Sequence, residues 1–453
     1  MHHLRLRRLQ HDHQKHFAGS LIMYHPVTHA QRVSKYFLFL FISMTILDEL
    51  HKKEVWKDFR DYKLEKNQLT KRESAELNSF IENEDYLKVT ETFSFGYPEK
   101  KLLTKMGSSK KRTVYSYGRE ETWVLKLLTY LLYKYDDRIS ASCYSFRKNR
   151  TSKSAFSSIL KIEDLDSKYV LKLDIHDYFN SIDVEKLLLI LQDIIDDDEE
   201  LLNLLRDLLR QDRCYFNGEL QEEKRGAMAG VPLASFFANV YLLSLDYRFE
   251  ERKIPYYRYS DDIIIFTDSR EERDMAYKLV LDELERKKLV LNPDKLQFSD
   301  PHEGWEFLGF SYRDGMIDLS AATVRKMKGK IRRKARKLYR WRKKNNVSFN
   351  KAARTMIRSF DYRFYDLTGN HDFTWTRFYF PVINDDKGLH QIDEYMLEHL
   401  RYLHSGRHYK GNYRIGYEDL KKLGYTPLVA EYYRWKKDNV LLNRKNRRST
   451  DAK

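Results

Sequence analysis

The chain has 453 residues, of which 42% are hydrophobic and 14% aromatic, so it can bury a large core and form two or three domains. Its formal net charge of +16 favours a polyanionic partner, and no stretch reaches the ~18 apolar residues of a membrane-spanning helix. Two cysteines, Cys143 and Cys214, exclude a disulfide framework and a cysteine-based zinc domain, which favours a reducing, cytoplasmic compartment.

Residues 1–43 differ in composition from the rest and contain seven of the fifteen histidines. Their basic start and the apolar run at 36–47 are similar to a signal peptide, but Asp48 and Glu49 stand where a cleavage site would lie. We interpret residues 1–43 as a non-native or disordered extension, with translation beginning at Met44. Residues 44–97 repeat apolar side chains at helical intervals and predict a helical lead-in.

A dense basic cluster follows, around a short Gly-Ser turn. Apolar pairs on either side of this turn, Leu102-Leu103 and Thr113-Val114-Tyr115, predict a β-hairpin with a cationic tip. Such a tip suits a triphosphate, although a solvated loop is the alternative. The cluster consists of Lys100, Lys101, Lys105, Lys110, Lys111, Arg112 and Arg119. A helix is expected over 120–135.

The run Tyr169–Ile175 is β-branched and aliphatic and contains Asp174 at its end. A carboxylate at the end of a buried strand is costly unless it is paired or binds a metal. A helix is expected to begin near Asp183. Residues 225–235 form a loop of small side chains, and the apolar segment after it predicts a buried helix.

The most informative stretch is Arg258-Tyr259-Ser260-Asp261-Asp262, which lies between two β-prone runs and predicts a hairpin turn. Two adjacent carboxylates repel each other, and a divalent cation is the simplest way to keep both ionised. An ordinary Asp-rich turn is the alternative. We expect Asp174 to be the third ligand.

After this turn the pattern predicts a helix over 270–288, a strand over 289–295 that enters a turn, and a strand pair over 305–310. Residues 325–344 then contain thirteen Lys or Arg and no acidic residue, which favours contact with a phosphate backbone over a merely solvated helix. Residues 346–453 predict a mostly helical domain rich in aromatic residues, with a disordered basic tail from Arg444.

In this order the motifs resemble a bacterial reverse transcriptase of the group II intron and retron-like lineage. The resemblance covers roughly residues 98–345 and implies an α+β, right-hand polymerase fold. It places fingers at 98–165, a palm with an antiparallel sheet at 166–300, and a palm–thumb junction with a basic thumb helix at 301–345. A helical carboxy-terminal extension occupies 346–453.

The same resemblance implies which residues act. Asp174, Asp261 and Asp262, with Ile175, would bind two Mg²⁺ ions, or Mn²⁺ in their place, and Lys295 would protonate pyrophosphate unless it is only a surface lysine. The residues that would contact the nucleotide are Lys110, Lys111, Arg112, Phe179, Gly230 and Tyr259. Phe179 would exclude a 2′-hydroxyl, or else be a core residue beside Tyr178.

Nucleic acid would be contacted by a second fingers motif and by the basic thumb helix. These residues are Arg147, Arg150, Arg332, Arg333, Lys334, Arg336, Lys337 and Arg340. The chain departs from the family at Ala229, where a glutamine is usual, and at Ala234-Ser235, where the family has Ser-Pro. This departure puts ordinary templated copying in doubt.

The resemblance implies an RNA-directed DNA polymerase whose partners are an RNA template, deoxynucleoside triphosphates and a DNA product. The lead-in and the carboxy-terminal segment are similar to unknown-group enzymes of antiphage defence, which implies a structured non-coding RNA partner. The retron-type Val-Thr-Gly signature is absent from the thumb. The alternatives are a group II intron-type maturase, a non-catalytic RNA-binding scaffold, and an RNA polymerase, which Phe179 disfavours.

Overall fold

The structure, a computed structural model, describes residues 45–104, 111–223, 226–365 and 374–450. The expected extension over residues 1–43 therefore lies outside the described residues. None of the helices in the described ranges is long and apolar enough to cross a membrane.

The helical lead-in is confirmed. Trp56 is fully buried and stacks on Tyr86 with ring centroids 5.2 Å apart, so this segment packs as part of the core. Thr70 begins one helix with a capping box, in which its hydroxyl accepts the Glu73 N–H at 3.2 Å. The helices are α2 (Ile46–Leu50), α3 (Lys53–Glu65), α4 (Lys71–Glu82) and α5 (Leu87–Thr90).

The predicted basic hairpin is also confirmed, as the antiparallel pair β1 (Glu99–Thr104) and β2 (Lys111–Ser116). Its tip lies outside the described residues. A second hairpin, β4 (Arg213–Phe216) and β5 (Glu219–Glu222), extends the sheet in the order β2-β1-β4-β5. The sequence did not predict this second hairpin.

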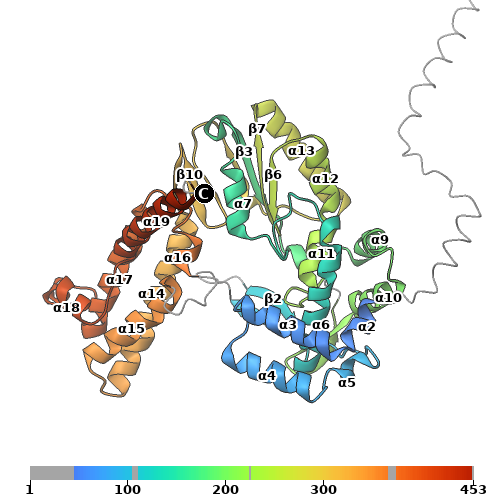
Figure 1. Ribbon diagram of the computed structural model, residues 1–453, viewed down its shortest axis with the longest axis horizontal. Coiled ribbons are helices and arrows are strands. Elements are labelled where there is room, and N and C mark those ends of the chain that lie inside the picture. The colour runs from blue at the N-terminus through green and yellow to red at the C-terminus, as the bar shows by residue number, and fades with distance from the viewer. Residues whose placement is uncertain (1–44, 105–110, 224–225, 366–373, 451–453) are drawn as a thin grey trace, which may run out of the picture. The chain divides into compact units, whose positions relative to one another are not determined.

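The central sheet contains the acidic residues and is antiparallel throughout, as expected for the palm. Its order is β6-β7-β3-β8, and β3 pairs with β7 so that Asp174 lies opposite Asp262. Figure 1 shows α13 (Arg270–Arg286) beside this sheet, and it contacts both β3 and β7. The strands are β3 (Tyr169–Asp174), β6 (Tyr256–Tyr259), β7 (Asp262–Thr267) and β8 (Gln297–Ser299).

Both faces of the central sheet are buried. Ile263 and Ile265 of β7 belong to one hydrophobic cluster, with α2–α5, α6 (Arg119–Leu131) and the helices that follow β3. Ile264 and Phe266 belong to a second cluster with the carboxy-terminal helices. Alternate side chains of a strand point to opposite faces. This explains why the run Ile263–Phe266 is apolar without alternation.

The helices that pack around this sheet begin close to the predicted positions. Asp183 caps α9 by accepting the Lys186 N–H at 3.1 Å. The elements are α6 (Arg119–Leu131), η2 (Leu132–Arg138), α7 (Ser152–Ile159), η3 (Leu165–Ser167), α8 (Tyr178–Ser181), α9 (Val184–Ile194), α10 (Glu199–Leu209), α11 (Ala234–Tyr241) and α12 (Leu243–Glu251).

Of the strand and turn predicted over 289–295, the turn is confirmed and the strand is wrong. Leu291 makes only an isolated bridge to Ile175, and the chain then forms a short 3₁₀ turn, η4 (Pro293–Lys295). Proline lacks the N–H that a ladder needs, and it also restricts the residue before it. The apolar run therefore ends in a turn instead of a strand.

A three-stranded sheet follows, with the order β11-β10-β9. Leu308 and Gly309, both at positive φ (49° and 95°), make the turn between the first two strands, so the predicted strand pair is confirmed. The strands are β9 (Trp305–Phe307), β10 (Phe310–Arg313) and β11 (Met316–Leu319).

The carboxy-terminal region is helical, as predicted. The basic helix α14 pairs closely with α17. The tail predicted to be disordered from Arg444 is instead helical to Thr450, because α19 contains no Gly or Pro to end it. The elements are α14 (Ala321–Lys344), α15 (Phe349–Phe364), α16 (Trp375–Phe378), α17 (Lys387–Ser405), η5 (Lys410–Arg414), α18 (Tyr417–Lys422) and α19 (Leu428–Thr450).

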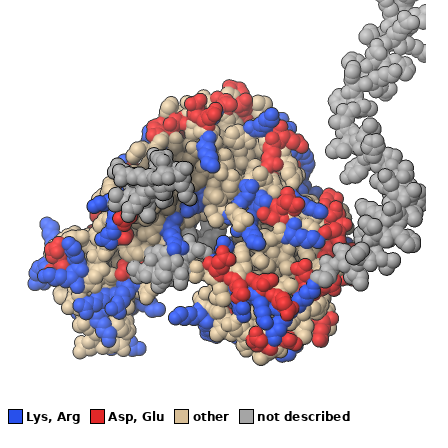
Figure 2. Space-filling model, in the orientation of Figure 1, with Lys and Arg blue, Asp and Glu red and all other residues tan. Residues whose placement is uncertain are grey.

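Charge is unevenly spread over the face shown in Figure 2. Lys and Arg gather over the end of the molecule that carries α15 and α18, whereas Asp and Glu gather over α9 and α10. The basic region is the part of this face best suited to a polyanion.

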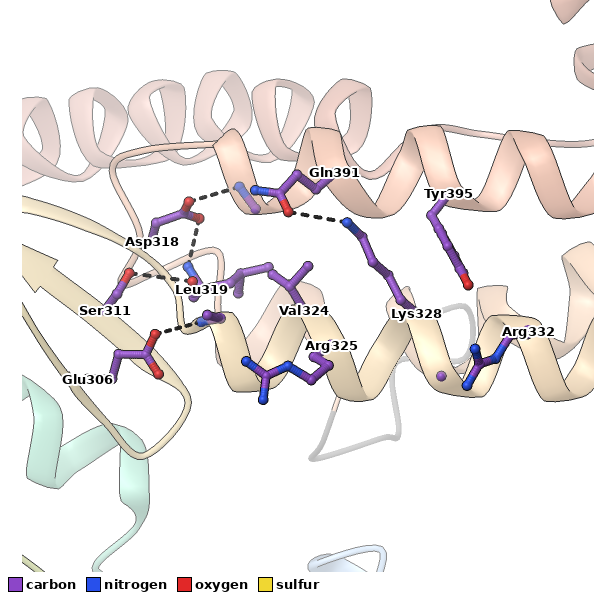
Figure 3. Close-up of a pocket in the computed structure, with 13 residues that line it drawn as sticks. Glu306, Ser311, Asp318, Leu319, Val324, Arg325, Lys328, Arg332, Gln391 and Tyr395 are labelled. Atoms are coloured by element: carbon purple, nitrogen blue, oxygen red, sulfur yellow. Dashed lines mark hydrogen bonds between the residues drawn. The ribbon is translucent and has the colours of Figure 1, made fainter. Parts of the chain in front are cut away.

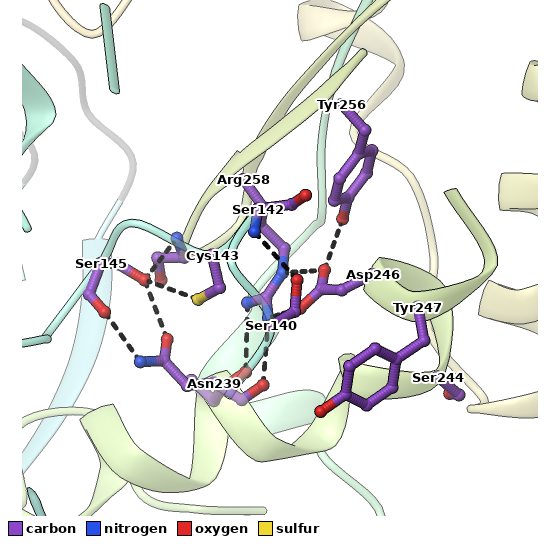
Figure 4. A network of polar contacts seen from close by, with 12 residues as sticks. Ser140, Ser142, Cys143, Ser145, Asn239, Ser244, Asp246, Tyr247, Tyr256 and Arg258 are labelled. Atoms are coloured by element: carbon purple, nitrogen blue, oxygen red, sulfur yellow. Dashed lines mark hydrogen bonds and ion pairs between the residues drawn. The ribbon is translucent and has the colours of Figure 1, made fainter. Parts of the chain in front are cut away.

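A fully buried ion pair lies beneath the β6–β7 turn (Figure 4). The guanidinium of Arg258 donates to the Asp246 carboxylate at 2.7 and 2.5 Å, and both side chains are 0% exposed. The Tyr256 hydroxyl donates to the same carboxylate at 2.8 Å. Burial opposes the charge of Arg258, but the adjacent carboxylate outweighs it and raises the pKa of Arg258.

We expect Asp246→Asn to lower the free energy of unfolding by about 3 kcal/mol, because it leaves the Arg258 charge buried without its counterion. Guanidinium chloride unfolding followed by circular dichroism measures this. The double variant Asp246→Leu/Arg258→Met should recover most of the loss.

The control for this prediction is Arg270→Met, which breaks the exposed pair with Asp300 and should cost less than about 1 kcal/mol. If Asp246→Asn lowers the free energy of unfolding no more than Arg270→Met does, the result would contradict a structural role for the buried pair.

Candidate active site

The three predicted carboxylates come together at one end of the central sheet. Asp174 is the last residue of β3, and Asp262 is the first residue of β7 and its direct cross-strand neighbour. Paired residues of a sheet point to the same face. Asp261 precedes Asp262 in the turn, and its carbonyl accepts the Ile175 N–H at 3.2 Å. The strand register thus brings residues 88 positions apart in the sequence into one acidic site.

Lys295 is the counterion of this site. Its ammonium group donates to Oδ2 of Asp174, whose side chain is only 3% exposed, while Lys295 is half exposed. Burial lowers the pKa of Lys295, but the hydrogen bond to Asp174 and the charge of Asp262 outweigh burial, so the pKa is raised. Lys295 is therefore held charged beside Asp174. Its predicted role as a proton donor stays a prediction.

Asn292 contacts Asp174, and the sequence did not indicate this contact. Its side-chain amide donates to Oδ1 of Asp174 at 3.1 Å, and its backbone N–H donates to the Asp174 carbonyl at 2.8 Å. Both carboxylate oxygens of Asp174 are thus engaged. Asn292 precedes Pro293 in a turn, and an Asn-Pro turn is too common to indicate a site.

Negative charge in the site is incompletely balanced. Burial, and then the charge of Asp174, raises the pKa of Asp261. Burial, together with the charge of Asp261, raises the pKa of Asp262 to about 6, although Lys295 opposes this shift. A cation close to the two carboxylates would lower both pKa values.

The donor chemistry of these residues fits a hard divalent cation, which prefers carboxylate oxygens. Within the described ranges, however, no group of three His, Cys, Asp or Glu side chains is placed to hold a metal ion. Asp174 accepts hydrogen bonds from Lys295 and Asn292. A cation would have to share Asp174 with Lys295. Binding of Mg²⁺ or Mn²⁺, and the contribution of Ile175 to it, stay predictions.

Phe179 lies in α8, which follows β3 directly. Its ring is half-buried and packs edge-on against Phe146, with ring centroids 6.2 Å apart, and beside Tyr178, with ring centroids 5.8 Å apart. Tyr178, in contrast, is buried and donates its hydroxyl to the Ala238 carbonyl at 2.6 Å. Of the two neighbouring rings, Phe179 is therefore the one accessible to a ligand.

The small-residue loop connects α8 to β2 through backbone atoms. The Ala229 N–H donates to the Asn180 side chain at 3.0 Å, and the Ala229 carbonyl accepts the Tyr115 N–H at 2.8 Å. Gly230 has φ +104°, and a Cβ there would lie 2.8 Å from the Tyr115 carbonyl, so only glycine fits. The sequence did not indicate this contact between Asn180 and Ala229 either.

The other predicted contact residues differ in accessibility. Lys110 lies outside the described residues, whereas Lys111 and Arg112 begin β2 and are exposed. Tyr259 ends β6, pairs with Asp262 and is half-buried. The guanidinium of Arg150 lies 4.9 Å from the centre of the Tyr144 ring and also donates to the Ala141 carbonyl.

The contacts of Arg147 favour a structural role. Its side chain is 7% exposed, and its guanidinium donates to the Asp136 carboxylate at 2.8 Å and to the carbonyls of Asp136 and Ser140 at 2.6 and 2.7 Å. These bonds leave little of the group for nucleic acid. The sequence did not reveal them because Asp136, in η2, and Ser140, in the loop after it, are near Arg147 only once the chain is folded.

The basic helix α14 presents most of the predicted residues to solvent. Lys334 is half-buried, and the others, Arg332, Arg333, Arg336, Lys337 and Arg340, are exposed. The opposite stripe, which includes Ile331 and Ala335, is buried against the neighbouring helices. The amphipathic pattern therefore gives one face to the core and one to solvent.

A hollow of about 610 Å³ lies between α14 and α17 (Figure 3). Its basic side chains, Arg325, Lys328 and Arg332, all come from α14, and Gln391 and Tyr395 face them from α17. Lys328 donates to Gln391 at 3.2 Å and lies 5.7 Å from the centre of the Tyr395 ring. The hollow thus combines cations with an aromatic ring.

Two carboxylates at one end of this hollow are already used by helix starts. Glu306 accepts the Ala321 N–H at 2.8 Å, and Asp318 accepts the Gly388 N–H at 2.8 Å, near the beginnings of α14 and α17. Among the described residues, none of the three basic side chains of the hollow pairs with a carboxylate. Their positive charge is available to an anion.

We expect the stability of the cation-free protein to fall as pH rises from about 4 to about 6, because the folded-state pKa of Asp262 exceeds its usual value of 3.8. Below this window Asp262 is protonated in both states, and above it the folded state must hold an unfavourable charge. In EDTA at pH 7.5, Asp262→Asn should therefore raise the Tm by about 1–3 °C.

Thermal unfolding with and without Mg²⁺ checks this prediction. Added Mg²⁺ should raise the Tm of the wild type and of the control Asp207→Asn, whose side chain is exposed on α10, but not that of Asp262→Asn. A lower Tm for Asp262→Asn in EDTA would contradict the assigned pKa shift.

Comparison with known proteins places this site in a family. The family model "Reverse transcriptase (RNA-dependent DNA polymerase)" matches residues 77–312, a range that contains all three carboxylates and Lys295. The retron Ec83 reverse transcriptase of Escherichia coli is 31% identical over 144 residues, which are 29% of this chain and 44% of that protein. The retron Ec86 reverse transcriptase of Escherichia coli is 24% identical over 242 residues, 51% of this chain and 67% of that protein.

Among solved structures, the telomerase of Candida albicans in complex with a fragment of telomeric RNA is 12% identical and has a TM-score of 0.40. That match covers 76% of this chain and 68% of the telomerase. This chain matches between about half and two thirds of the length of the two retron reverse transcriptases. The family model matches just over half of this chain. The chain belongs to the reverse transcriptase family.

Proposed function

We propose that this chain is an RNA-directed DNA polymerase. The observation that carries the proposal is the meeting of Asp174, Asp261 and Asp262 at one end of the central sheet, within the residues that match the family model. Three like charges kept together and partly buried are costly for a protein that only binds RNA. They are useful to one that gathers cations around a nucleoside triphosphate.

The proposed reaction joins the primer 3′-hydroxyl oxygen to the α-phosphorus of a deoxynucleoside triphosphate, and pyrophosphate leaves. When bound, two divalent ions would lower the pKa of that hydroxyl and neutralise the leaving group. Asp174, Asp261 and Asp262 would hold these ions, and Lys295, already charged beside Asp174, would offer its ammonium group to the pyrophosphate. Lys111 and Arg112, exposed at the start of β2, would contact the triphosphate.

Phe179 is proposed as the residue that selects deoxynucleotides. Its ring is half-buried, follows the strand that carries Asp174, and is supported edge-on by Phe146. A rigid ring beneath the sugar would clash with a 2′-hydroxyl. This placement is the reason to prefer a DNA polymerase over an RNA polymerase.

We also propose a biological setting, antiphage defence with a structured non-coding RNA as partner. Its support is the resemblance of the helical lead-in and of the carboxy-terminal segment to defence-associated enzymes, together with the net charge of +16. The curated relatives carry the name of retron reverse transcriptases.

Incorporation of labelled deoxynucleotides by the purified protein, with Mg²⁺ and co-purifying RNA, tests the polymerase. We expect synthesis by the wild type and by Asp207→Asn, and a loss of about 10³-fold or more in Asp261→Asn/Asp262→Asn, because the double variant keeps the shape of the site without its charge. Ribonucleotides should be poor substrates, and sequencing the product identifies its template.

Absence of synthesis with every primer and metal, with RNA bound equally by wild type and double variant, would contradict the polymerase. That result would favour the maturase or the scaffold.

The hollow between α14 and α17 is the proposed contact for a nucleic-acid backbone. Replacing Arg325, Lys328 and Arg332 by glutamine should weaken RNA binding and reduce the slope of log K against log salt concentration by about 2, since each phosphate contact releases ~0.7 counterion from a single strand. Fluorescence anisotropy with a labelled single-stranded RNA at several salt concentrations measures both effects.

The matched control removes the same charge elsewhere, by replacing exposed Lys71, Lys88 and Lys161 with glutamine. Equal changes in slope for the two triple variants would show that net charge, and not this hollow, determines binding.

A further inference from the structure

The turn that carries Asp261 has a strained backbone. Ser260 adopts φ 61°, in the left-handed region that few residues other than glycine occupy, and it is only 5% exposed. Such a conformation persists only where surrounding contacts hold it. The direction in which the chain presents Asp261 therefore depends on what binds the Ser260 backbone.

The Ser260 N–H is bound by a side chain from a distant part of the sequence. The hydroxyl oxygen of Ser145 accepts this N–H at 2.9 Å, and Ser145 is fully buried. A buried N–H without an acceptor is costly. Water has little access at this depth, so Ser145 is the partner that satisfies the N–H.

Asn239 of α11 fixes the orientation of the Ser145 hydroxyl. Its side-chain oxygen accepts the Ser145 hydroxyl hydrogen at 2.9 Å, and its side-chain nitrogen donates to the Ser145 carbonyl at 2.7 Å. With its hydrogen directed to Asn239, the hydroxyl has a lone pair free for Ser260. Asn239 is 2% exposed, so the pair forms a closed, buried arrangement.

The backbone around Ser145 is itself held against β6. The Tyr144 N–H donates to the Arg258 carbonyl at 2.9 Å, and the Arg258 N–H donates to the Ser142 carbonyl at 2.9 Å. The Arg258 guanidinium donates to the Asn239 carbonyl at 3.0 Å. These bonds fix the register of the 142–145 segment along β6, and that register places Ser145 at the turn.

We propose that Ser145 and Asn239 are positioning residues for the acidic turn, acting through the Ser260 backbone to set the place of Asp261 relative to Asp174. This inference rests on the proposed polymerase function for its consequence in catalysis. Neither side chain needs to touch the nucleotide. Loss of the hydroxyl should let the turn relax toward negative φ and should misplace one carboxylate of the three.

The test compares Ser145→Ala with Ser299→Ala. Ser299 is a buried serine of β8 whose hydroxyl donates to the Gly304 carbonyl and, within the described part of the chain, makes no hydrogen bond to the turn. Hydrogen exchange followed by mass spectrometry should show about 5- to 10-fold faster exchange over residues 256–262 in Ser145→Ala alone. Peptides over 310–319 serve as the internal reference and should be unchanged in both variants.

Two further measurements show whether the turn matters to the site. Mn²⁺ titration followed by electron paramagnetic resonance should show about 3- to 10-fold weaker binding in Ser145→Ala, and kcat for deoxynucleotide incorporation should fall with little change in KM. If Ser145→Ala does not fold, the near-isosteric Ser145→Cys, a weaker hydrogen-bond acceptor, should show the same changes at smaller size.

The inference would be overturned if Ser145→Ala and Ser299→Ala showed the same exchange over residues 256–262 and the same Mn²⁺ affinity. The exchange measurement needs neither metal nor nucleotide, so it decides the role of Ser145 even if the wild type incorporates no nucleotide. In that case the polymerase proposal fails, and the positioning inference is judged separately.

Discussion

Three carboxylates meet in a partly buried site at one end of the central sheet, and the polar contacts around them are arranged about this charge. Asp174 and Asp262 are direct neighbours across β3 and β7, and Asp261 adjoins them in the turn. Burial and mutual repulsion raise the pKa of Asp261 and Asp262, so the arrangement would open unless other contacts held it. Much of the surrounding polar structure serves this purpose. Lys295 and Asn292 hold Asp174 from the side, while Ser145 holds the backbone of the turn.

Charged side chains lie at two depths near the β6–β7 turn. Beneath it, the pair of Arg258 and Asp246 is complete in itself, with further hydrogen bonds from Tyr256 and to the carbonyl of Asn239. At the surface of the site the balance is incomplete, since in the described part of the chain only one of the three carboxylates, that of Asp174, forms an ion pair with an ammonium group. The divalent cations proposed for this site would complete its charge balance. The buried pair of Arg258 and Asp246 would hold β6 in place with or without a cation at the carboxylates.

Much of the fold could be predicted from local patterns, and the failures have local causes. The hairpin of β1 and β2, the hairpin of β6 and β7 and the basic helix α14 follow from β-prone runs, turn residues and helical periodicity, whereas the antiparallel central sheet was implied by the family resemblance. The strand expected over 289–295 was wrong, because Pro293 ends the ladder, and the tail beyond Arg444 is helical, because charge alone does not break a helix. The second hairpin, β4 and β5, was missed because its two strands have only four residues each.

Residue order and composition are enough to establish the succession of the acidic motifs, the excess of positive charge and the resemblance to the family. They could not determine which polar residues support the acids, because Ser145, Asn239 and Asn292 are ordinary loop and helix residues until the chain folds. Only the tertiary structure brings Ser145 to the Ser260 N–H, across 115 residues, and turns Arg147 inward to Asp136. The physical reason is that hydrogen bonds and ion pairs depend on distance in space, which periodicity and composition do not encode.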